Sequence, residues 1–282
     1  MEIRSATPDD LELAYELLSA QSRAAFGISE VARSDLEQRW SAAVVDRYLT
    51  DAGYAALDET GTFELAAADR AEADALFETV AARARERGLA ELHTVVADAD
   101  VPFLALVERA GFTRHGGVWR MWKPLDGELP EAQWPDGVLV RTYENADGVR
   151  VQALLDDAYT AWDATYVPRT HEDWLAWMTD HDDFDPGLWF LAERDGALVA
   201  CALNWRERQG RGWVKDLVVA EGERGRGLAN ALLHHTFRTY AARGATHVGL
   251  KVEPENPTGA PQLYERVGFA TDRTYGIWVK RL

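Results

Sequence analysis

The residues of this chain best suited to bind an anion form a glycine-spaced turn, RGRGLA, at positions 224–229. The turn follows an apolar run, LVVA at 217–220, and precedes a helical pattern over 229–240. Glycines at a strand-to-helix turn let backbone N–H groups converge, and the positive end of the helix dipole points at the same place. The pattern therefore predicts that a phosphate-bearing ligand binds at this turn.

The turn belongs to a longer alternation of strands and helices in the second half of the chain. Hydrophobic periodicity and turn residues predict the order β-α-α-β-β-β-α-β-α-β from Val140 onward. The expected strands are 140–142, 188–194, 197–206, 213–219, 245–252 and 269–280, and the expected helices include 146–160, 229–242 and one that ends at Val267. This order predicts an α/β protein with a mixed, mostly antiparallel sheet and helices on its faces.

The chain repeats itself on either side of a segment that is rich in charge and turn formers, 124–137. The motif LYERVGF at 263–269 matches LVERAGF at 106–112, and a strand with a basic end follows each motif. A repeat on this scale predicts two copies of one domain. We therefore expect a domain over 1–123, a linker over 124–137 and a second domain over 138–282.

The first copy lacks the anion-binding turn. In place of RGRGLA it has ADRAEA at 68–73, which contains no glycine. Two carboxylates, Asp69 and Glu72, stand where an anion would have to bind, and like charges repel. The sequence therefore predicts a phosphate site in the second half only.

Composition limits the other classes of partner. The chain has 282 residues, is 47% hydrophobic and carries a net charge of −17, which is typical of a soluble globular protein that repels nucleic acid. It has no apolar run long enough to span a membrane, and the polar start MEIRSATPDD does not resemble a signal peptide. The single cysteine, Cys201, forms no internal disulfide, so we expect it to pack in a strand of a cytoplasmic protein. The acidic run 180–185 lacks EF-hand spacing and predicts a turn, so no metal site is expected.

Two motifs of the second half resemble the GNAT superfamily of acetyl-CoA-dependent N-acetyltransferases. The family's acetyl-CoA signature is Arg or Gln, two residues, Gly, one residue, then Gly or Ala, and it is matched by Arg224, Gly227 and Ala229. The second signature is an Asn followed by a helix that ends in Leu-Tyr-Glu-Arg-x-Gly-Phe. It is matched by Asn256 and residues 263–269, about 30 residues after the first. Both motifs stand in the expected strand-turn-helix context.

The resemblance covers 138–282 well and 1–123 weakly. It implies two GNAT-like domains, each a twisted, mostly antiparallel sheet flanked by helices. It also implies that acetyl-CoA is the cofactor and that the second domain is catalytic. The first domain is then a degenerate copy without a cofactor site.

The resemblance also assigns roles to residues at the turn. Backbone N–H groups of the turn would bind the CoA pyrophosphate, and its residues are Arg224, Gly225, Arg226, Gly227, Leu228 and Ala229. Leu217, Val218 and Val219 form the strand beside the pantetheine arm, and the backbone of Leu217 and Val219 pairs with that arm like an added strand. Asn256 would hydrogen-bond the same arm. The other interpretation of Asn256 is a helix N-cap, because Pro257 follows it.

Tyr264 occupies the position of the family's usual general acid, which protonates the departing CoA thiolate. A phenol, with an ordinary pKa of about 10, can donate to a thiolate whose thiol has a pKa of about 8.5. The other interpretation of Tyr264 is a core aromatic residue at helical spacing. In the first half Val107 holds the matching position and has no proton to donate, so we expect that half to be inactive.

The base that deprotonates the acceptor amine has three candidates: Asp216, Glu253 and a chain of water molecules. Side chains alternate between the two faces of a strand. Asp216 therefore faces away from the side that Leu217 and Val219 share, unless a bulge intervenes. Lys215 has the same parity as Leu217, but an ammonium group is a poor base unless its pKa is depressed.

Aromatic residues gather in the helical region before the second-half sheet. They are Tyr159, Trp162, Tyr166, Trp174 and Trp177. In GNAT proteins this region often shapes the acceptor pocket, so these residues either line such a pocket or pack in the core.

These features together predict an N-acetyltransferase that moves an acetyl group from acetyl-CoA directly to an amine of a small molecule or peptide. The alternative is a non-catalytic acyl-CoA-binding or regulatory module with the same fold. Tyr264 and a usable base distinguish the two. The sequence names neither the acceptor amine nor the oligomeric state.

Overall fold

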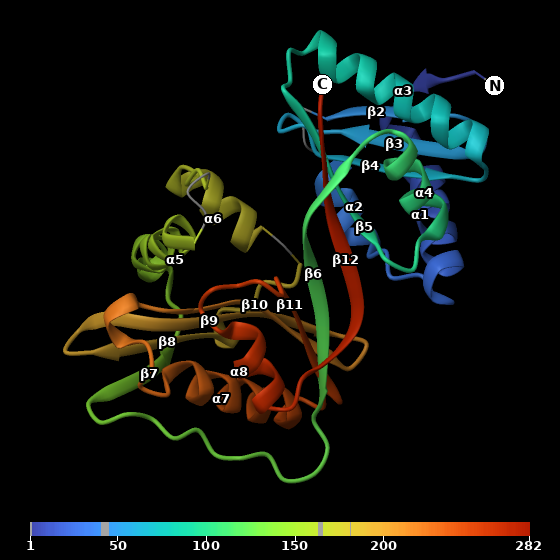
Figure 1. Cartoon of the computed structure of the whole chain (residues 1–282). Helices are drawn as coiled ribbons and strands as arrows, with labels where there is room; N and C mark the ends of the chain where they lie inside the picture. The colour runs from blue at the N-terminus through green and yellow to red at the C-terminus, as the bar shows by residue number, and fades with distance from the viewer. Residues whose placement is uncertain (1, 41–44, 163–165, 181) are drawn as a thin grey trace. The chain divides into compact units, whose positions relative to one another are not determined.

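The computed structural model describes the whole chain except residues 1, 41–44, 163–165 and 181. Contacts divide the chain into two compact units (Figure 1). Unit 1 comprises Met1–Val118 and Arg273–Leu282, and unit 2 comprises Trp119–Asp272. Each unit combines a sheet with flanking helices, which confirms the predicted α/β class.

Unit 2 contains the elements expected of the second domain. Its strands are β7 (Val138–Thr142), β8 (Trp189–Arg194), β9 (Ala197–Arg208), β10 (Arg211–Val219), β11 (His247–Val252) and the adjoining parts of β6 (Thr113–Pro124) and β12 (Ala270–Arg281). Its helices are α5 (Gly148–Trp162), α6 (His171–Thr179), α7 (Leu228–Ala242) and α8 (Ala260–Arg266), with 3-10 turns η2 (Asn145–Asp147), η3 (Pro186–Leu188) and η4 (Glu221–Glu223). From β7 onward the order is β-α-α-β-β-β-α-β-α-β, so the prediction from periodicity is confirmed.

The sheet of unit 2 is antiparallel except between two central strands. Its strand order is β6-β11-β10-β9-β8-β7. β10 and β11 run parallel and pair only where Arg211–Trp213 meets His247–Gly249, although both strands are described along their whole length. Beyond Trp213 the two strands no longer pair with each other. The backbone edge that β10 turns toward β11 is therefore available to another extended chain.

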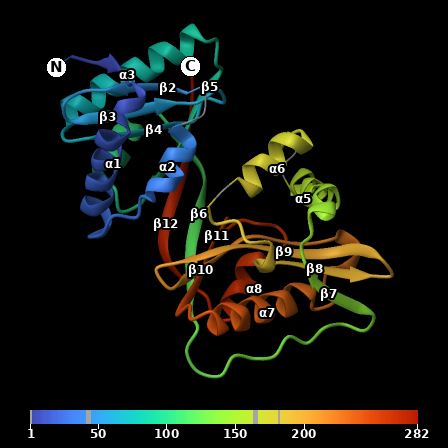
Figure 2. The ribbon, with the colours of Figure 1, turned by 180° about the vertical axis from the view of Figure 1, so that it is seen from behind.

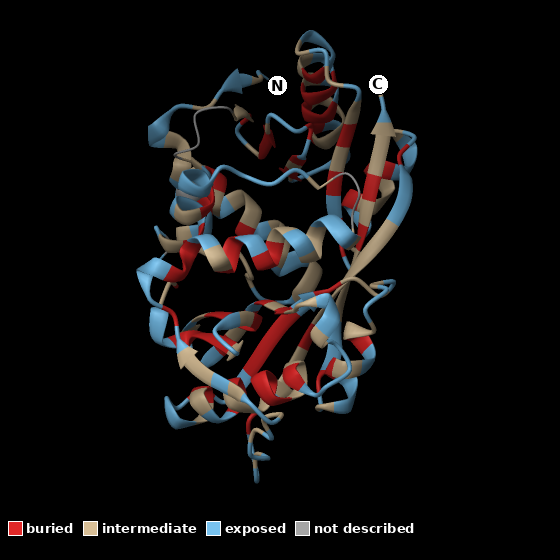
Figure 3. Cartoon of the chain, turned by 90° about the vertical axis from the view of Figure 1, so that its left-hand side faces the viewer, coloured by how far each residue is buried: buried red, intermediate tan, exposed pale blue. Residues whose placement is uncertain are grey.

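Helices cover both faces of this sheet (Figures 1 and 2). On one face α7 and α8 pack over a core that includes Val214 and Phe237, which we call the α7 core. On the other face α5 and α6 pack over a core that includes Leu155 and Cys201, which we call the α5 core. Cys201 is fully buried, as expected for a packed strand residue. Figure 3 shows buried residues in red along the strands and on the helices.

Unit 1 is built on the same principle. Its strands are β1 (Arg4–Ser5), β2 (Asp46–Leu49), β3 (Gly53–Leu57), β4 (Phe63–Ala67) and β5 (Glu91–Ala97), and its helices are η1 (Pro8–Asp10), α1 (Leu11–Phe26), α2 (Arg33–Trp40), α3 (Arg70–Glu86) and α4 (Val101–Arg109). β1 to β4 form an antiparallel sheet in chain order. The core between this sheet and its helices includes Leu76, Phe77 and Val107.

Two strands pass from one unit to the other. Residues 119–124 of β6 pair with β11 in unit 2, whereas residues 275–281 of β12 pair with β5 in unit 1. The contact-based units therefore differ from the predicted domains 1–123 and 138–282 at both strands. The reason is long-range strand pairing, because the two strands exchange between the halves of the chain.

The segment 124–137, predicted as a linker, packs along its length on unit 2. Leu125 is buried in the α7 core, and Leu129 and Trp134 pack against that core. Nη1 of Arg238 on α7 donates a hydrogen bond of 3.1 Å to the Leu129 carbonyl oxygen. The segment is thus part of unit 2 and contributes apolar surface to it.

Candidate active site

The predicted anion-binding turn joins η4 to α7 and is exposed. Gly225 and Gly227 have φ angles of 76° and 87°, in the left-handed region that glycine adopts without a steric penalty. No heavy atom lies within 4 Å of the position that a Cβ would take at either glycine. The backbone path, and not a lack of space, therefore requires glycine at both positions.

Backbone N–H groups of this turn are unpaired. Among the described residues, none accepts a hydrogen bond from the N–H groups of Gly225, Arg226 or Gly227. The first hydrogen bond of α7 runs from Ala231 N to Gly227 O at 2.9 Å, so the N–H groups of Leu228–Asn230 have no helical acceptor. Gly227, the N-cap, has no side chain to satisfy them. These donors, with the positive end of the α7 dipole, suit a phosphate group.

Arg224 and Arg226 add positive charge beside the turn. Nε of Arg224 donates to the Val219 carbonyl oxygen at 3.3 Å, which holds the side chain near the end of β10. Within the described part of the chain its guanidinium has no carboxylate partner. Arg226 is 55% exposed and lies 3.5 Å from Glu223. Arg224 is thus the better placed of the two to contact a phosphate.

Leu217, Val218 and Val219 form the end of β10, directly before the turn. Leu217 and Val219 pack against the α7 core, and Val218 lies in the α5 core. On one edge this segment pairs with Ala200–Ala202 of β9, and on the other it has no pairing with β11. The predicted pairing with a pantetheine arm therefore has an open strand edge available.

A β-bulge at Lys215 decides which way Asp216 points. Val214 and Asp216 pair with consecutive residues of β9, so Lys215 is an extra residue in β10. Asp216 pairs with Leu203, which lies in the α5 core, whereas Val214 lies in the α7 core. Asp216 still faces away from Leu217, as alternation predicts. Because of the bulge it also faces away from Val214, so its carboxylate points toward α5.

Asp216 is 7% exposed and is hydrogen-bonded on that face. The hydroxyl of Tyr159 on α5 donates to Oδ1 of Asp216, and Nζ of Lys215 lies 3.5 Å from Oδ2. Burial raises the pKa of the Tyr159 hydroxyl, and the charge of Asp216 raises it further. The carboxylate is therefore a buried charge, and among the residues that the structure describes one phenol is the main group that fixes its position.

Tyr264 on α8 has features of both a core aromatic residue and a proton donor. It is 7% exposed and packs in the α7 core, with its ring centroid 5.7 Å from that of Phe269. Its hydroxyl has no hydrogen-bond partner within the described residues. Burial, and then the charge of Asp216, raises the pKa of this hydroxyl. A raised pKa keeps the phenol protonated at neutral pH, as a general acid must be.

Asn256 does not cap α8. The N-cap is Gly259, with a φ of 75°, so the helix-cap interpretation of Asn256 is wrong. Oδ1 of Asn256 instead accepts from N and Oγ1 of Thr258, at 3.0 and 2.5 Å. This arrangement leaves its Nδ2 donors for a ligand carbonyl. Glu253 follows β11, is partly buried, and accepts from Asn256 N through its backbone oxygen at 3.1 Å.

The aromatic residues of the helical region fall into two groups. Trp174 packs in the α5 core, as the core interpretation expects, and Trp177 is 45% exposed. The others lie together, because the ring centroid of Tyr159 is 6.3 Å from Trp162 and 5.4 Å from Tyr166. This second group stands on the side of β10 to which Asp216 points.

Sequence reasoning missed two phenol–carboxylate contacts on this side. The Tyr159 hydroxyl donates to Asp216, and the Tyr166 hydroxyl donates to Asp156 at 2.7 Å. The sequence marked both tyrosines only as members of an aromatic group. The contact with Asp216 joins a helix to a strand 57 residues later, and no spacing rule reports such a pair.

The corresponding helix start in unit 1 has different chemistry. The Asp69 side chain caps α3 and accepts from Glu72 N at 3.0 Å. The buried Glu72 carboxylate accepts from the Thr50 hydroxyl. The Asp69 carboxylate thus takes an N–H donor that a phosphate would use, and Val107 is buried at the position that matches Tyr264. These contacts support the expectation that unit 1 has no cofactor site.

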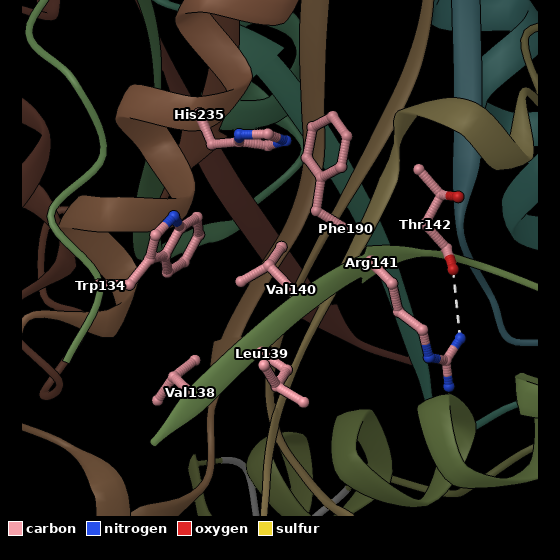
Figure 4. A pocket seen from close by; sticks show the side chains of 8 residues that line it. All are labelled: Trp134, Val138, Leu139, Val140, Arg141, Thr142, Phe190 and His235. Carbon is pink, nitrogen blue, oxygen red and sulfur yellow. Dashed lines mark hydrogen bonds between the residues drawn. The ribbon is translucent and has the colours of Figure 1, made fainter. Parts of the chain in front are cut away.

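A separate hollow of about 420 Å³ lies along β7 (Figure 4). Trp134, Val140, Phe190 and His235 surround it, and Arg141 points away from them. The hollow is mainly apolar and has none of the donors of the turn. It therefore offers little for transfer of a group.

Two aspartates of the acidic run 180–185 form ion pairs with arginines. Asp183 pairs with Arg208 and Asp185 with Arg243, whereas His181 lies outside the described residues. No cluster of His, Cys, Asp and Glu that could hold a metal ion occurs in the described ranges. None of the helices described is long and apolar enough to cross a membrane.

The fold and the turn together define the class of protein. The model of the acetyltransferase (GNAT) family matches residues 150–269, which include the turn and Tyr264. A tandem GNAT protein from the clavulanic acid biosynthesis pathway, solved without AcCoA, covers 99% of this chain and 98% of its own at a TM-score of 0.78 and 16% identity. The tandem architecture implied by the internal repeat is therefore confirmed.

Curated relatives give the same family. A mycothiol acetyltransferase of Acidothermus cellulolyticus is 30% identical over 252 residues, which cover 77% of this chain and 72% of the relative. One of Saccharopolyspora erythraea is 32% identical over 178 residues, 61% of this chain and 58% of the relative. The match therefore spans little more than half of the Saccharopolyspora protein. The chain belongs to the GNAT family of acetyltransferases, whose cofactor is acetyl-CoA, as the resemblance implied.

Proposed function

We propose that this chain is an acetyl-CoA-dependent N-acetyltransferase whose active site lies in unit 2. The observation that carries the proposal is a row of N–H donors from Gly225 to Asn230 that have no acceptor among the described residues. This row follows the end of β10, whose edge toward β11 is open. A protein that binds a ligand with a phosphate group and an amide-bearing arm needs both features, the N–H donors for the phosphate and the open strand edge for the arm. Acetyl-CoA supplies an acetyl group activated as a thioester.

The donors available fit this ligand. The turn offers N–H groups and Arg224 to a pyrophosphate, and Leu217 and Val219 offer backbone groups to the amides of the pantetheine arm. Nδ2 of Asn256 offers a further donor on the other side of the open edge. We assign these residues to cofactor binding.

We assign the two proton transfers to Asp216 and Tyr264. The Asp216 carboxylate takes a proton from the acceptor ammonium, because it is the buried carboxylate that the bulge turns toward α5. The Tyr264 hydroxyl gives its proton to the departing sulfur, since it is protonated and has no partner among the described residues. Glu253 is the rival base, and it lies at the end of β11.

The relatives indicate which class of acceptor should be tested first. Since they are mycothiol acetyltransferases, we propose a small-molecule amine acceptor, and the unacetylated precursor of mycothiol is the first to test. Unit 1 serves as a partner domain without a cofactor of its own. We place the protein in the cytoplasm, where its buried and unpaired Cys201 stays reduced.

The test is acetylation of a panel of amines by the full chain. The panel contains the mycothiol precursor, a polyamine, an aminoglycoside and a peptide with a free N-terminus. Products are identified by mass, because an acceptor that carries its own thiol would obscure the thiol released from CoA. Acetylation of one of these amines supports the proposal. Tight binding of acetyl-CoA with no acetylated product would favour the non-catalytic acyl-CoA-binding module.

A further inference from the structure

Within the described part of the chain, the carboxylate of Asp216 has few partners for a buried charge. Its side chain is 5% exposed and shares a face with the apolar Leu203 and Val218. Oδ1 is held by the Tyr159 hydroxyl. Oδ2 has Nζ of Lys215 at 3.5 Å, which is long for a hydrogen bond. The two oxygens are therefore unequal, and as far as the described residues go, Oδ2 is the one with unused acceptor capacity.

Tyr159 is suited to hold Oδ1 in place. It lies in the last turns of α5, and α5 packs on β9 and β10 through Leu155 and the rest of the α5 core. Its ring contacts Trp162 and Tyr166, which limits the rotation of the side chain. Burial raises the pKa of its hydroxyl, so it remains a donor across the neutral range. A phenol on a packed helix is a firmer support than the flexible Lys215.

We propose that Tyr159 is a positioning residue, whose hydroxyl fixes Oδ1 of Asp216 so that Oδ2 is presented to the acceptor ammonium. This inference rests on the proposed function, in which Asp216 is the base. Tyr159 does not itself take or give a proton in the transfer. Loss of its hydroxyl leaves the carboxylate in place but free to rotate toward Lys215, so turnover falls while cofactor binding, which uses other residues, is unchanged.

The test compares Tyr159→Phe with Tyr143→Phe. Tyr143 lies in the same core, is 4% exposed, and its hydroxyl has no partner among the described residues. Tyr143→Phe therefore removes the same atom without removing a hydrogen bond that the structure shows. We expect Tyr159→Phe to lower kcat about 30-fold, the size of one hydrogen bond to a charged group. Its dissociation constant for acetyl-CoA should match that of the wild type. Tyr143→Phe should change kcat less than about 2-fold.

A double-mutant cycle with Asp216→Asn separates positioning from damage to the fold. If Tyr159 acts through Asp216, adding Tyr159→Phe to Asp216→Asn causes no further loss of kcat. Equal further loss in both backgrounds would overturn the inference, as would a normal kcat for Tyr159→Phe. Failure of the proposed function looks different, because the wild type itself would then bind acetyl-CoA and acetylate no amine.

Discussion

Val214 and Val218 of β10 pack into opposite cores of unit 2, although an even separation along a regular strand would place them on one face. The extra residue between them is Lys215, which the register with β9 leaves unpaired. The bulge has a chemical consequence. It takes Asp216 away from the α7 core, where a lone carboxylate would be costly, and places it next to the hydroxyl of Tyr159.

Asp216→Asn tests the assignment of the base. The amide keeps the shape of the side chain but cannot take a proton at neutral pH, so we expect kcat to fall about 100-fold or more. Glu253→Gln is the matched substitution at the rival carboxylate. Steady-state kinetics of both variants with the same acceptor decide between them, and a larger loss in Glu253→Gln would remove Asp216 as the base.

Tyr264→Phe tests the general acid. The variant keeps the ring that packs against Phe269, so stability should change little. It deletes only the hydroxyl, and we expect kcat to fall about 100-fold with an unchanged dissociation constant for acetyl-CoA. Calorimetric titration and turnover measured on the same preparation check both parts. Turnover equal to that of the wild type would show that Tyr264 is only a core residue.

Gly227→Glu tests the position of the cofactor site. A carboxylate at this N-cap repels a pyrophosphate, and a left-handed φ of 87° strains any side chain there. We expect acetyl-CoA affinity to fall at least about 100-fold. Gly244→Glu is the control, because Gly244 has a φ of 86° and open space around it but lies after the other end of α7. The assignment fails if the two variants bind acetyl-CoA equally well.

Features that depend on neighbouring residues could be predicted from the sequence, whereas features that depend on residues far away in the chain could not. Gly225 and Gly227 were identified because glycines at a strand-to-helix turn let backbone N–H groups converge, whatever packs around them. Alternation along the strand predicted that Asp216 faces away from Leu217. The bulge that separates Asp216 from the face of Val214 could not be predicted, because it exists only through the register of β10 with β9. The exchange of β6 and β12 escaped prediction for the same reason, since each strand finds its partner far away in the sequence.

Asn256 shows that even local patterns can mislead. An Asn before Pro257 is typical of a helix start, yet the chain makes another turn at Thr258 and α8 begins at Ala260. The side-chain oxygen of Asn256 accepts a hydrogen bond from the nearby N–H group of Thr258. The resemblance to the family assigned this residue to the ligand, and the unused Nδ2 donors agree with that proposal.

Unit 1 leads to a prediction about stoichiometry. Asp69 accepts from Glu72 N at the start of α3, and the charges of Asp69 and Glu72 repel a second pyrophosphate there. We expect calorimetry to give one acetyl-CoA per chain, and we expect Gly227→Glu to remove that single event. Two binding events in the wild type, with one surviving in the variant, would show that unit 1 also holds a cofactor.

Asp147 provides a prediction about stability and pH. It is 4% exposed and accepts from Nη1 and Nη2 of Arg141 at 2.6 and 2.7 Å. The hydrogen bonds from Arg141 are the main cause that lowers the pKa of Asp147 in the folded protein. A carboxyl group with a lowered folded pKa stabilises the fold fully above its ordinary pKa of about 4, and this stabilisation is lost as the pH falls further.

We therefore expect Asp147→Asn to lower the free energy of unfolding by about 2 kcal/mol at pH 7, the typical value for hydrogen bonds to a charged group. The difference from the wild type should shrink as the pH is lowered below about 4, because Asp147 of the unfolded wild type then binds a proton that the folded protein does not. Asp157→Asn is the control, since Asp157 is exposed on α5 and should change stability by less than about 0.5 kcal/mol at either pH. Urea unfolding followed by tryptophan fluorescence from pH 7 to pH 3.5 measures both, and a difference for Asp147→Asn that stays constant over this range would contradict the assignment of its stabilisation to the Arg141 ion pair.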